Sequence, residues 1–325
     1  MIQKSLFKVI SPYKRAFSLF RVRVIRSYKK AYRNYISVLF MLLINTKASY
    51  HKNVYVKVHL RNEKRLKIPI GWVEGYVRLL SVKNINISDS KLTNNGLSFK
   101  YKGLPVILNL ARFSDPDAVF FNESYKFLNV KDRDVIDIGM NIGDSSIYFS
   151  INGAKRVIGL EPYPYAFSFA EKNVKLNGIN NIILLNAGYG KDSNVIIDPE
   201  IISSSGSSLI SSVKGKNVPI LSLKTLIDKY NIKSAILKMD CEGCEYALLN
   251  EDDEVFNHIE MIQIEYHYGY EELVKKLKNC GFDVKYTEPH KFYNSEAENQ
   301  DMYVGYIYAK RKSSMTKVSK KQIEN

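Results

Sequence analysis

In the stretch Asp134-Val135-Ile136-Asp137-Ile138-Gly139-Met140-Asn141-Ile142-Gly143-Asp144, alternating apolar and acidic residues run directly into two glycines. The alternation predicts a buried strand, and the glycines predict a tight turn before a helix from Ser145 to Ile151. Strand, glycine turn and helix bring a backbone close to a nucleotide-like ligand, because glycine has no Cβ to obstruct the approach. The stretch therefore predicts an α/β fold with a ligand at this turn.

A second apolar strand, Arg156–Leu160, ends at Glu161, about two dozen positions after the first strand. A carboxylate in this place can accept hydrogen bonds from both hydroxyls of a ribose. Glu161 therefore strengthens the prediction of a ligand that contains a nucleoside.

The acidic residues at the turn indicate which nucleotide binds. A dinucleotide would place its pyrophosphate at the helix N-terminus, where unpaired N–H groups favour an anion. Here Asp137 and Asp144 would repel a pyrophosphate, and Asn141 stands where the dinucleotide pattern has its second glycine. The turn favours S-adenosylmethionine, a cationic donor without phosphate, over NAD, and it favours both over a glycine turn that binds nothing.

The positive charge of the chain is concentrated at its N-terminus. Of 325 residues, 48 are Lys or Arg and 33 are Asp or Glu, and the formal net charge is +15. No acidic residue precedes Glu63, whereas the first 62 positions contain fourteen basic residues, so the remainder is nearly neutral. The basic residues are concentrated in an N-terminal arm and, less strongly, in a C-terminal tail. The part of the chain that carries the candidate site is nearly neutral.

The apolar run Tyr35–Ile44 in this arm has ten residues, whereas a membrane span needs about twenty. It also lacks the position and the small following residues of a secretory signal. Before it, Phe17, Phe20, Val24 and Tyr28 recur at helical spacing among basic residues, which predicts a basic amphipathic helix. Such a helix can lie on an anionic membrane or pack against its own protein, and both alternatives stay open. Nucleic acid is disfavoured as a partner, although aromatic and basic residues interleave.

Three cysteines, Cys241, Cys244 and Cys280, give no disulfide framework. The first two have the spacing of half a zinc site or of a redox pair, but no two further ligands at matching spacing accompany them. We expect two small residues that fill a strand-to-helix turn, in a protein of a reducing compartment, the cytoplasm.

Along the rest of the chain, residues 51 to 131 are β-rich, including Trp72 to Leu80, and Phe120 to Leu128 predicts a short helix. After Asp134, strands alternate with helices, which predicts a mostly parallel sheet with helices on both faces. The last two strands are joined without a helix, so we expect them to pair antiparallel. The serine-rich stretch from Ile201 to Ser212 predicts a surface loop, or one that covers the ligand. Expected strands are 135–138, 156–160, 182–186, 234–239, 260–265, 282–286 and 302–309, and expected helices are 145–152, 165–177, 223–230, 246–251 and 271–280.

Ligands of open α/β sheets bind beyond the carboxyl ends of the strands, so the polar residues there are the candidate site. Five strands supply such residues, and a purely structural sheet does not need them. They are Asp137, Gly139, Asn141 and Gly143 after the first strand, Glu161 and Pro162 after the second, Asn186 and Ala187 after the third, Lys238 to Glu245 at the fourth, and Glu265 to His267 at the fifth.

Three motifs together resemble the FkbM family of S-adenosylmethionine-dependent methyltransferases. They are Asp137-Ile138-Gly139-Met140-Asn141-Ile142-Gly143, Gly159-Leu160-Glu161-Pro162, and Leu237-Lys238-Met239-Asp240-Cys241-Glu242-Gly243-Cys244-Glu245. The resemblance covers about residues 115 to 310. It implies the class I methyltransferase fold, with a Rossmann-like seven-stranded sheet, and methylation of a hydroxyl, often on a sugar. The two cysteines depart from the family pattern, which has small or apolar residues there.

Charge and pattern divide the chain into a basic arm (1–50), a β-rich segment (51–130), a methyltransferase domain (131–310) and a basic tail (311–325) that we expect to be disordered, and the resemblance mostly excludes the first two. The resemblance implies that Asp137, Gly139, Asn141 and Gly143 line the methionine end of the cofactor. It also implies that Glu161, beside Pro162, holds the ribose, and that Asn186 and Ala187 lie near the adenine.

Removal of the hydroxyl proton by a base could accelerate methyl transfer by about 10²–10⁴-fold. The candidates for this base are His267 and Asp240, with Glu242 as a hydrogen-bond partner of the substrate and Lys238 as an electrostatic aid. Glu245 is expected only to cap the following helix. A divalent metal at Asp240, Glu242 and Glu265 is the alternative to metal-free catalysis.

The sequence thus predicts an O-methyltransferase for a small-molecule or glycan acceptor, such as a saccharide or glycolipid. Two alternatives stay open: a non-catalytic relative that its arm tethers to membrane or nucleic acid, and an NAD-dependent enzyme.

Overall fold

The computed structural model describes residues 22–44, 54–61, 64–81, 84–110, 116–200, 212–291 and 303–312. The arm before residue 22, the serine-rich loop and the tail beyond residue 312 lie outside the described residues. The chain divides into two compact units. The N-terminal unit comprises Met1–Ser124, Ile142–Asp144 and Ser168–Ile179, and the C-terminal unit comprises Tyr125–Asn141, Ser145–Phe167 and Asn180–Asn325.

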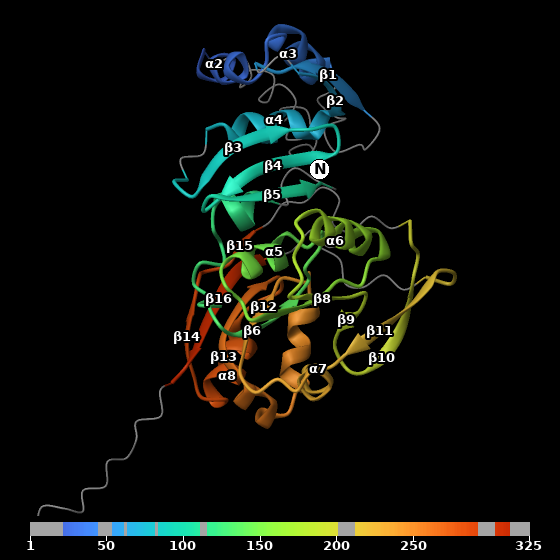
Figure 1. The fold of residues 1–325 in the computed structure, drawn as a ribbon. Coiled ribbons are helices and arrows are strands. Elements are labelled where there is room, and N and C mark those ends of the chain that lie inside the picture. Colours follow the sequence, from blue (N-terminus) through green and yellow to red (C-terminus); the bar gives the residue numbers. More distant parts are fainter. Residues whose placement is uncertain are drawn as a thin grey trace, which may run out of the picture. The chain divides into compact units, whose positions relative to one another are not determined.

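The C-terminal unit is built on one large sheet (Figure 1). Its continuous path runs β14-β16-β13-β12-β6-β7-β8, and the two-residue strand β15 pairs with β16 in addition. The strands from β13 to β8 are parallel, whereas β16 is antiparallel to both of its neighbours, β13 and β14. The mostly parallel α/β sheet and the antiparallel final pair are therefore confirmed. The strand bounds are β6 (Asp134–Ile138), β7 (Arg156–Leu160), β8 (Ile182–Leu185), β12 (Ala235–Met239), β13 (Ile259–Tyr266), β14 (Phe282–Tyr286), β15 (His290–Lys291) and β16 (Tyr303–Arg311).

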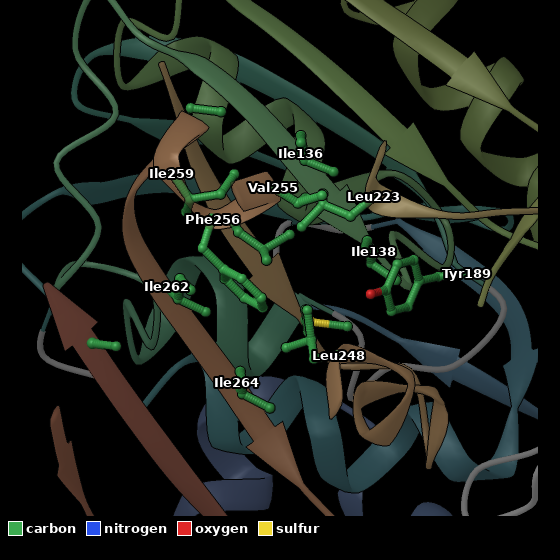
Figure 2. Packing of buried hydrophobic residues seen from close by; sticks show 14 of the residues in the cluster. Ile136, Ile138, Tyr189, Leu223, Leu248, Val255, Phe256, Ile259, Ile262 and Ile264 are labelled. Atoms are coloured by element: carbon green, nitrogen blue, oxygen red, sulfur yellow. The ribbon is translucent and has the colours of Figure 1, made fainter. Parts of the chain in front are cut away.

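One face of this sheet carries the main hydrophobic core (Figure 2). Ile136 and Ile138 of β6 point into it together with Ile262 and Ile264 of β13, because alternate residues of a strand share a face. The helices that close it are α7 (Leu223–Tyr230), α8 (Glu271–Asn279) and the 3₁₀ turns η2 (Cys244–Asn250) and η3 (Asp253–His258). The sequence predicted residues 246–251 as a helix, and the structure has a 3₁₀ helix there.

The opposite face of the same strands is polar at its centre. Asp137 of β6 lies in register with Lys238 of β12, and Lys238 lies in register with Gln263 of β13. All three side chains are at most 1% exposed. Helix α5 (Asp144–Ile151) supplies the hydroxyls that bind Asp137 on this face, whereas α6 (Pro164–Leu176) links β7 to β8.

A three-stranded sheet that the sequence did not predict follows β8. It contains β9 (Gly188–Tyr189), β10 (Ser193–Ile197) and β11 (Lys216–Leu221), in the order β10-β11-β9. Ile197 and Val218 pack there with Tyr163 and Ala166 in a small separate core. The predicted serine-rich loop falls between β10 and β11, in the part that is not described.

The N-terminal unit begins with two short helices, α2 (Val22–Ala31) and α3 (Tyr35–Ile44). The antiparallel pair β1 (Tyr55–His59) and β2 (Arg65–Pro69) follows, then helix α4 (Ile70–Leu79). A meander of β3 (Ile87–Leu92), β4 (Gly96–Tyr101) and β5 (Leu104–Asn109) precedes a π-helical turn, η1 (Asp117–Phe121). Within the described residues, no helix is long and apolar enough to cross a bilayer.

Two predictions for this unit are wrong in detail. Trp72 to Leu80 was expected to be β-rich, but it lies almost entirely in α4. Val73 and Val77, four residues apart, are both buried, so a helical period was present beneath the β-favouring composition. The helix expected from Phe120 to Leu128 is limited to η1 and the turns that follow it.

Candidate active site

The glycine turn after β6 lies against the backbone at the end of β12. Gly139 has φ +77°, and a Cβ on it would lie 1.9 Å from the carbonyl oxygen of Asp240. The backbone amide of Asp240 donates to the carbonyl of Ile138, and both Gly139 and Met140 donate to the carbonyl of Leu160. Glycine at position 139 is therefore what lets the predicted cofactor turn and Asp240 lie side by side.

Asp137 stabilises this turn from inside the protein. One carboxylate oxygen accepts hydrogen bonds from the hydroxyls of Ser145 and Ser146, both 2.7 Å long. The other oxygen lies 3.1 Å from the ammonium of Lys238. Asp137 is completely buried, so its carboxylate fixes the start of α5. The prediction was instead that Asp137 would line the methionine end of the cofactor.

Lys238 also acts on the turn. Its ammonium donates to the carbonyls of Gly139, at 2.7 Å, and of Ile138, at 3.2 Å. The side chain is 1% exposed, so it is not placed to reach a substrate. Its charge balances Asp137 and holds the carbonyls of the turn, and this is a positioning role for the predicted electrostatic aid.

Glu161 binds the backbone on both sides of the predicted ribose site. Its two oxygens accept from the amides of Asn141, at 3.1 Å, and Tyr163, at 2.9 Å. Asn141 has φ +49°, which turns its amide toward this carboxylate. Burial raises the pKa of Glu161 to about 7, although these hydrogen bonds oppose the shift. Each carboxylate oxygen keeps a second lone pair for a ligand hydroxyl.

Asn186 provides an acceptor beside Glu161. Its amide nitrogen donates to the carbonyls of Glu161 and Pro162, which ties the ends of β7 and β8 together. Its side-chain oxygen is buried and has no hydrogen-bond partner among the residues that the structure describes. A buried acceptor without a partner is costly, and the exocyclic amine of an adenine is the kind of donor that would satisfy it. Ala187, the next residue, is buried.

Gly143 closes the other end of the turn. It has φ +81°, and a Cβ there would lie 3.1 Å from the Cβ of Ala170 in α6. Asn173, one helical turn further on, donates to the carbonyl of Ile142 at 2.9 Å. Gly143 is thus explained by a positive φ and by close packing on α6.

The end of β12 presents Asp240 to the polar face of the sheet. Its side chain is half-buried and accepts a hydrogen bond from the hydroxyl of Tyr125, at 3.2 Å. Burial and the charge of nearby Asp240 raise the pKa of Glu265 in β13 to about 8. One carboxylate of this neighbouring pair therefore holds a proton more firmly than an isolated one would.

His267 lies between two carboxylates. Its Nδ1 is 2.9 Å from Glu245 and its Nε2 is 3.3 Å from Glu242. Burial opposes the charged form, but the hydrogen bond with Glu245 and the nearby carboxylate charges outweigh it and raise the pKa of His267 to about 10. The imidazole is therefore an imidazolium at neutral pH.

Glu245 does more than the helix capping expected of it. It is fully buried, and besides the imidazole it accepts from the backbone amides of Gly243 and His267. It fixes the loop after β12 and the end of β13 in one arrangement. No local sequence signal identified this contact, because its partner lies 22 residues away.

The expectation of two unbonded cysteines is wrong. Cys241 and Cys244 form a disulfide across this loop, with Cα atoms 5.5 Å apart, which is within the usual range for a disulfide. The positive φ angles of Glu242 and Gly243, +59° and +120°, fold the chain tightly enough for the two sulfurs to meet. The reason given for a reducing compartment therefore no longer holds.

The side chains that could hold a metal differ from those predicted. Ligand atoms of Asp240, Glu242 and His267 lie within 4.8 Å of one another, so His267 takes the place that was expected for Glu265. The imidazole of His267 lies between Glu242 and Glu245, so in its protonated form it places positive charge beside these carboxylates.

Three aromatic rings lie beside the acidic end of the polar face, and they were not predicted from the sequence. Tyr306 and Tyr308 of β16 lie in register with Glu265 and Gln263, and their rings stack with centroids 6.2 Å apart. Phe127 meets Tyr308 edge-on at 5.2 Å. The period-two pattern of β16 was the available signal, since residues 306 and 308 share a face.

A cavity of about 880 Å³ opens at the amino ends of the strands, away from these residues. Its charged groups are largely paired: Arg156 with Asp134 at 2.6 Å, and Arg133 with Glu260 at 2.9 Å. Because ligands of such sheets bind at the carboxyl ends, the glycine turn, Asp240 and His267 form the candidate active site.

The part of the chain that matches a known family contains the residues of this candidate site. Residues 137–284 match the family model of the methyltransferase FkbM domain, and the resemblance noted in the sequence is confirmed. The matched range starts at Asp137 and contains Glu161, Asp240, Glu245 and His267.

Two curated proteins are similar over shorter stretches. A protein named as an N5-glutamine methyltransferase of Methanocaldococcus jannaschii is 42% identical over 53 residues, which is 16% of this chain and 27% of that protein. The ribosomal protein L11 methyltransferase of Alkaliphilus oremlandii is 29% identical over 132 residues, 37% of this chain and 41% of that one. The chain thus spans less than half of the length of either relative.

Among solved structures, M. jannaschii TYW2 in complex with AdoMet aligns with 68% of this chain and 89% of its own. The identity is 15% and the TM-score is 0.38. The fold assignment therefore rests on the strand order and the FkbM domain rather than on this likeness.

Proposed function

We propose that the protein is an S-adenosylmethionine-dependent O-methyltransferase whose acceptor is a saccharide or a related polyhydroxylated molecule. One observation carries the proposal: Gly139 in the cofactor turn lies directly against the backbone of Asp240, the residue that follows β12 and carries a half-buried carboxylate. The turn that would bind the methyl donor is therefore next to Asp240, the proposed base. Glu161 and the unpartnered oxygen of Asn186 offer acceptors for a ribose and an amine, which fits the nucleoside of this cofactor.

S-adenosylmethionine, when bound, supplies a methyl group whose transfer forms a C–O bond and breaks a C–S bond, with the electron pair leaving on sulfur. The hydroxyl of the acceptor must also lose its proton. We assign this proton to Asp240, which ends a central strand and is half-buried. His267 is less suited as the base, because both of its ring nitrogens face carboxylates.

The other residues of the site hold Asp240 and the acceptor in place. Tyr125 donates a hydrogen bond to Asp240 and so orients its carboxylate. Glu245 fixes His267, and His267 in turn faces Glu242, which stays half-buried and accessible to an acceptor hydroxyl. Much of the rate of a two-substrate transfer comes from such positioning.

The saccharide class is supported by the surroundings of Asp240. Tyr306, Tyr308 and Phe127 offer flat apolar surfaces, and Asp240, Glu242 and Glu265 offer hydrogen-bond acceptors close by. A sugar presents C–H faces and many hydroxyl donors, so it can use both kinds of group. The named relatives act on glutamine nitrogen or on a ribosomal protein, and these acceptors serve as the alternatives in the assay.

The direct test is transfer of a labelled methyl group by the full chain to extracts separated into glycans, glycolipids, proteins and RNA. We expect the label in the glycan or glycolipid fraction, in an alkali-stable ether. Label in protein as N-methylglutamine, or in RNA, would overturn the choice of acceptor. Cofactor binding without label in any fraction would indicate a non-catalytic domain.

Glu161 should make cofactor binding depend on pH. Only the ionised carboxylate can accept from both ribose hydroxyls, and its pKa in the free protein is about 7. Affinity should therefore fall about tenfold for each pH unit below 7 and level off above 8. Calorimetric titration of the wild type and of Glu161→Gln measures this effect. The ligand's own titration is common to both proteins, so the ratio of the two affinities isolates Glu161. A ratio that stays constant between pH 5 and 8 would remove Glu161 from the site.

Removal of divalent cations should leave methyl transfer unchanged. The positive charge between the carboxylates already belongs to His267, held by Glu245 and Glu242. We expect initial rates in EDTA to stay within about twofold of those in MgCl₂, the usual spread for an unaffected kinetic parameter. Loss of activity in EDTA that Mg²⁺ restores would instead make Asp240, Glu242 and His267 metal ligands.

A further inference from the structure

Helix α3 exposes an apolar ridge. Ile36, Phe40 and Ile44 recur every fourth residue and are 69%, 60% and 59% exposed. This spacing places them along one face of a helix, over a length of about 12 Å. Val38 and Leu42, on the other side, are almost completely buried. The helix therefore has two apolar faces, and only one of them belongs to the protein core.

The ridge is part of a well-anchored structure rather than of a free arm. The backbone amide of Arg33 donates to the carbonyl of His59 in β1, and Asn34 exchanges side-chain hydrogen bonds with the backbone of the same strand. Tyr32 is fully buried, and its hydroxyl donates to the carbonyl of Val73 in α4. Helices α2 and α3 are thus fixed on the N-terminal unit before any partner binds.

Basic residues accompany the ridge. Arg26, Lys29 and Lys30 of α2 are exposed. No Asp or Glu precedes position 63, so this positive charge has no acidic counterpart in the first 62 residues. Each basic residue near an anionic bilayer surface strengthens binding about fivefold.

We propose that the α2–α3 pair is a membrane-attachment surface that binds anionic lipid headgroups through α2 and inserts Ile36, Phe40 and Ile44 into the bilayer boundary. Apolar and basic side chains together match the interfacial region, where acyl chains meet charged headgroups. A nucleic acid would bind the basic residues, but two of the three ridge residues, Ile36 and Ile44, are aliphatic and cannot stack on bases. With ten residues α3 is too short to span a bilayer, so the helix lies on its surface.

The test is sedimentation of the full chain with vesicles of phosphatidylcholine alone or with about a third phosphatidylserine. We expect binding to the anionic vesicles, weakened by about 0.5 M salt, which shortens electrostatic attraction. The triple variant Ile36→Ser, Phe40→Ser, Ile44→Ser should bind at least about tenfold more weakly. Lys29→Glu with Lys30→Glu should lower binding to anionic vesicles independently of the ridge.

Ile85→Ser with Leu104→Ser is the matched control, because both residues are exposed and apolar but lie outside the α2–α3 pair. It should sediment like the wild type. Equal binding by the wild type and the triple variant would overturn the proposal. So would wild-type binding to single-stranded RNA without binding to vesicles, or no binding to either vesicle.

Discussion

Asp240→Asn is expected to lower kcat for methyl transfer by about 10²–10⁴-fold, because the amide cannot take up the hydroxyl proton. The amide keeps the shape of the carboxylate and an oxygen for the hydrogen bond from Tyr125. The backbone contact between position 240 and Gly139 is also unchanged. Affinity for S-adenosylmethionine should therefore stay within about twofold of the wild-type value.

Single-turnover kinetics with the labelled donor measures the first effect, and calorimetry measures the second. Tyr125→Phe is the companion variant, since it removes only the hydrogen bond that orients Asp240, and it should cost far less than the loss of the carboxylate. Wild-type kcat in Asp240→Asn would show that another group is the base. A strong fall in kcat in His267→Gln, with Asp240→Asn unaffected, would return that role to the imidazole.

Gly139→Ala is expected to abolish measurable cofactor binding, a loss of at least about 100-fold, because the turn must move away from Asp240. The added Cβ would lie 1.9 Å from the Asp240 carbonyl oxygen, and φ of +77° is itself unfavourable for alanine. The backbone of Asp240 cannot move aside as the end of a flexible side chain could. Calorimetric titration of the folded variant with S-adenosylmethionine measures the loss.

Gly103→Ala separates the effect of backbone strain from the effect of the contact between the added Cβ and Asp240. Gly103 has φ +81°, but a Cβ there would meet nothing within 4 Å. It should lower the free energy of unfolding by about 1–2 kcal/mol through backbone strain alone. Its affinity for S-adenosylmethionine should be that of the wild type. Full binding by Gly139→Ala would show that the turn does not form the cofactor site.

The sequence predicted the sheet well because its strands carry a strong local signal. Residues Val135 to Ile138 alternate between the two faces and end in glycines, and the positions of β6 and its turn follow from that pattern. The prediction of β structure for Trp72 to Leu80 was wrong. Its β-branched and aromatic residues favour strands, whereas the burial of Val73 and Val77 follows the helical period. Composition was given more weight there than periodicity.

The candidate site was predictable as a set of strand ends, but not as a network of contacts. The pattern identified Asp240, Glu242 and His267, which the structure brings together. It could not show that Glu245 holds His267, nor that Lys238 binds the turn of a different strand, because both contacts depend on tertiary structure. The disulfide was missed for the same reason: spacing alone does not fix the positive φ of the two intervening residues.

The central claim is that the glycine turn at Gly139, together with Glu161, binds a cationic methyl donor. Titration calorimetry of the full chain with S-adenosylmethionine, and separately with NAD, tests it most directly. We predict heat of binding at one site per chain for S-adenosylmethionine and none for NAD. Binding of NAD, or a folded protein that gives no heat with S-adenosylmethionine, would contradict it.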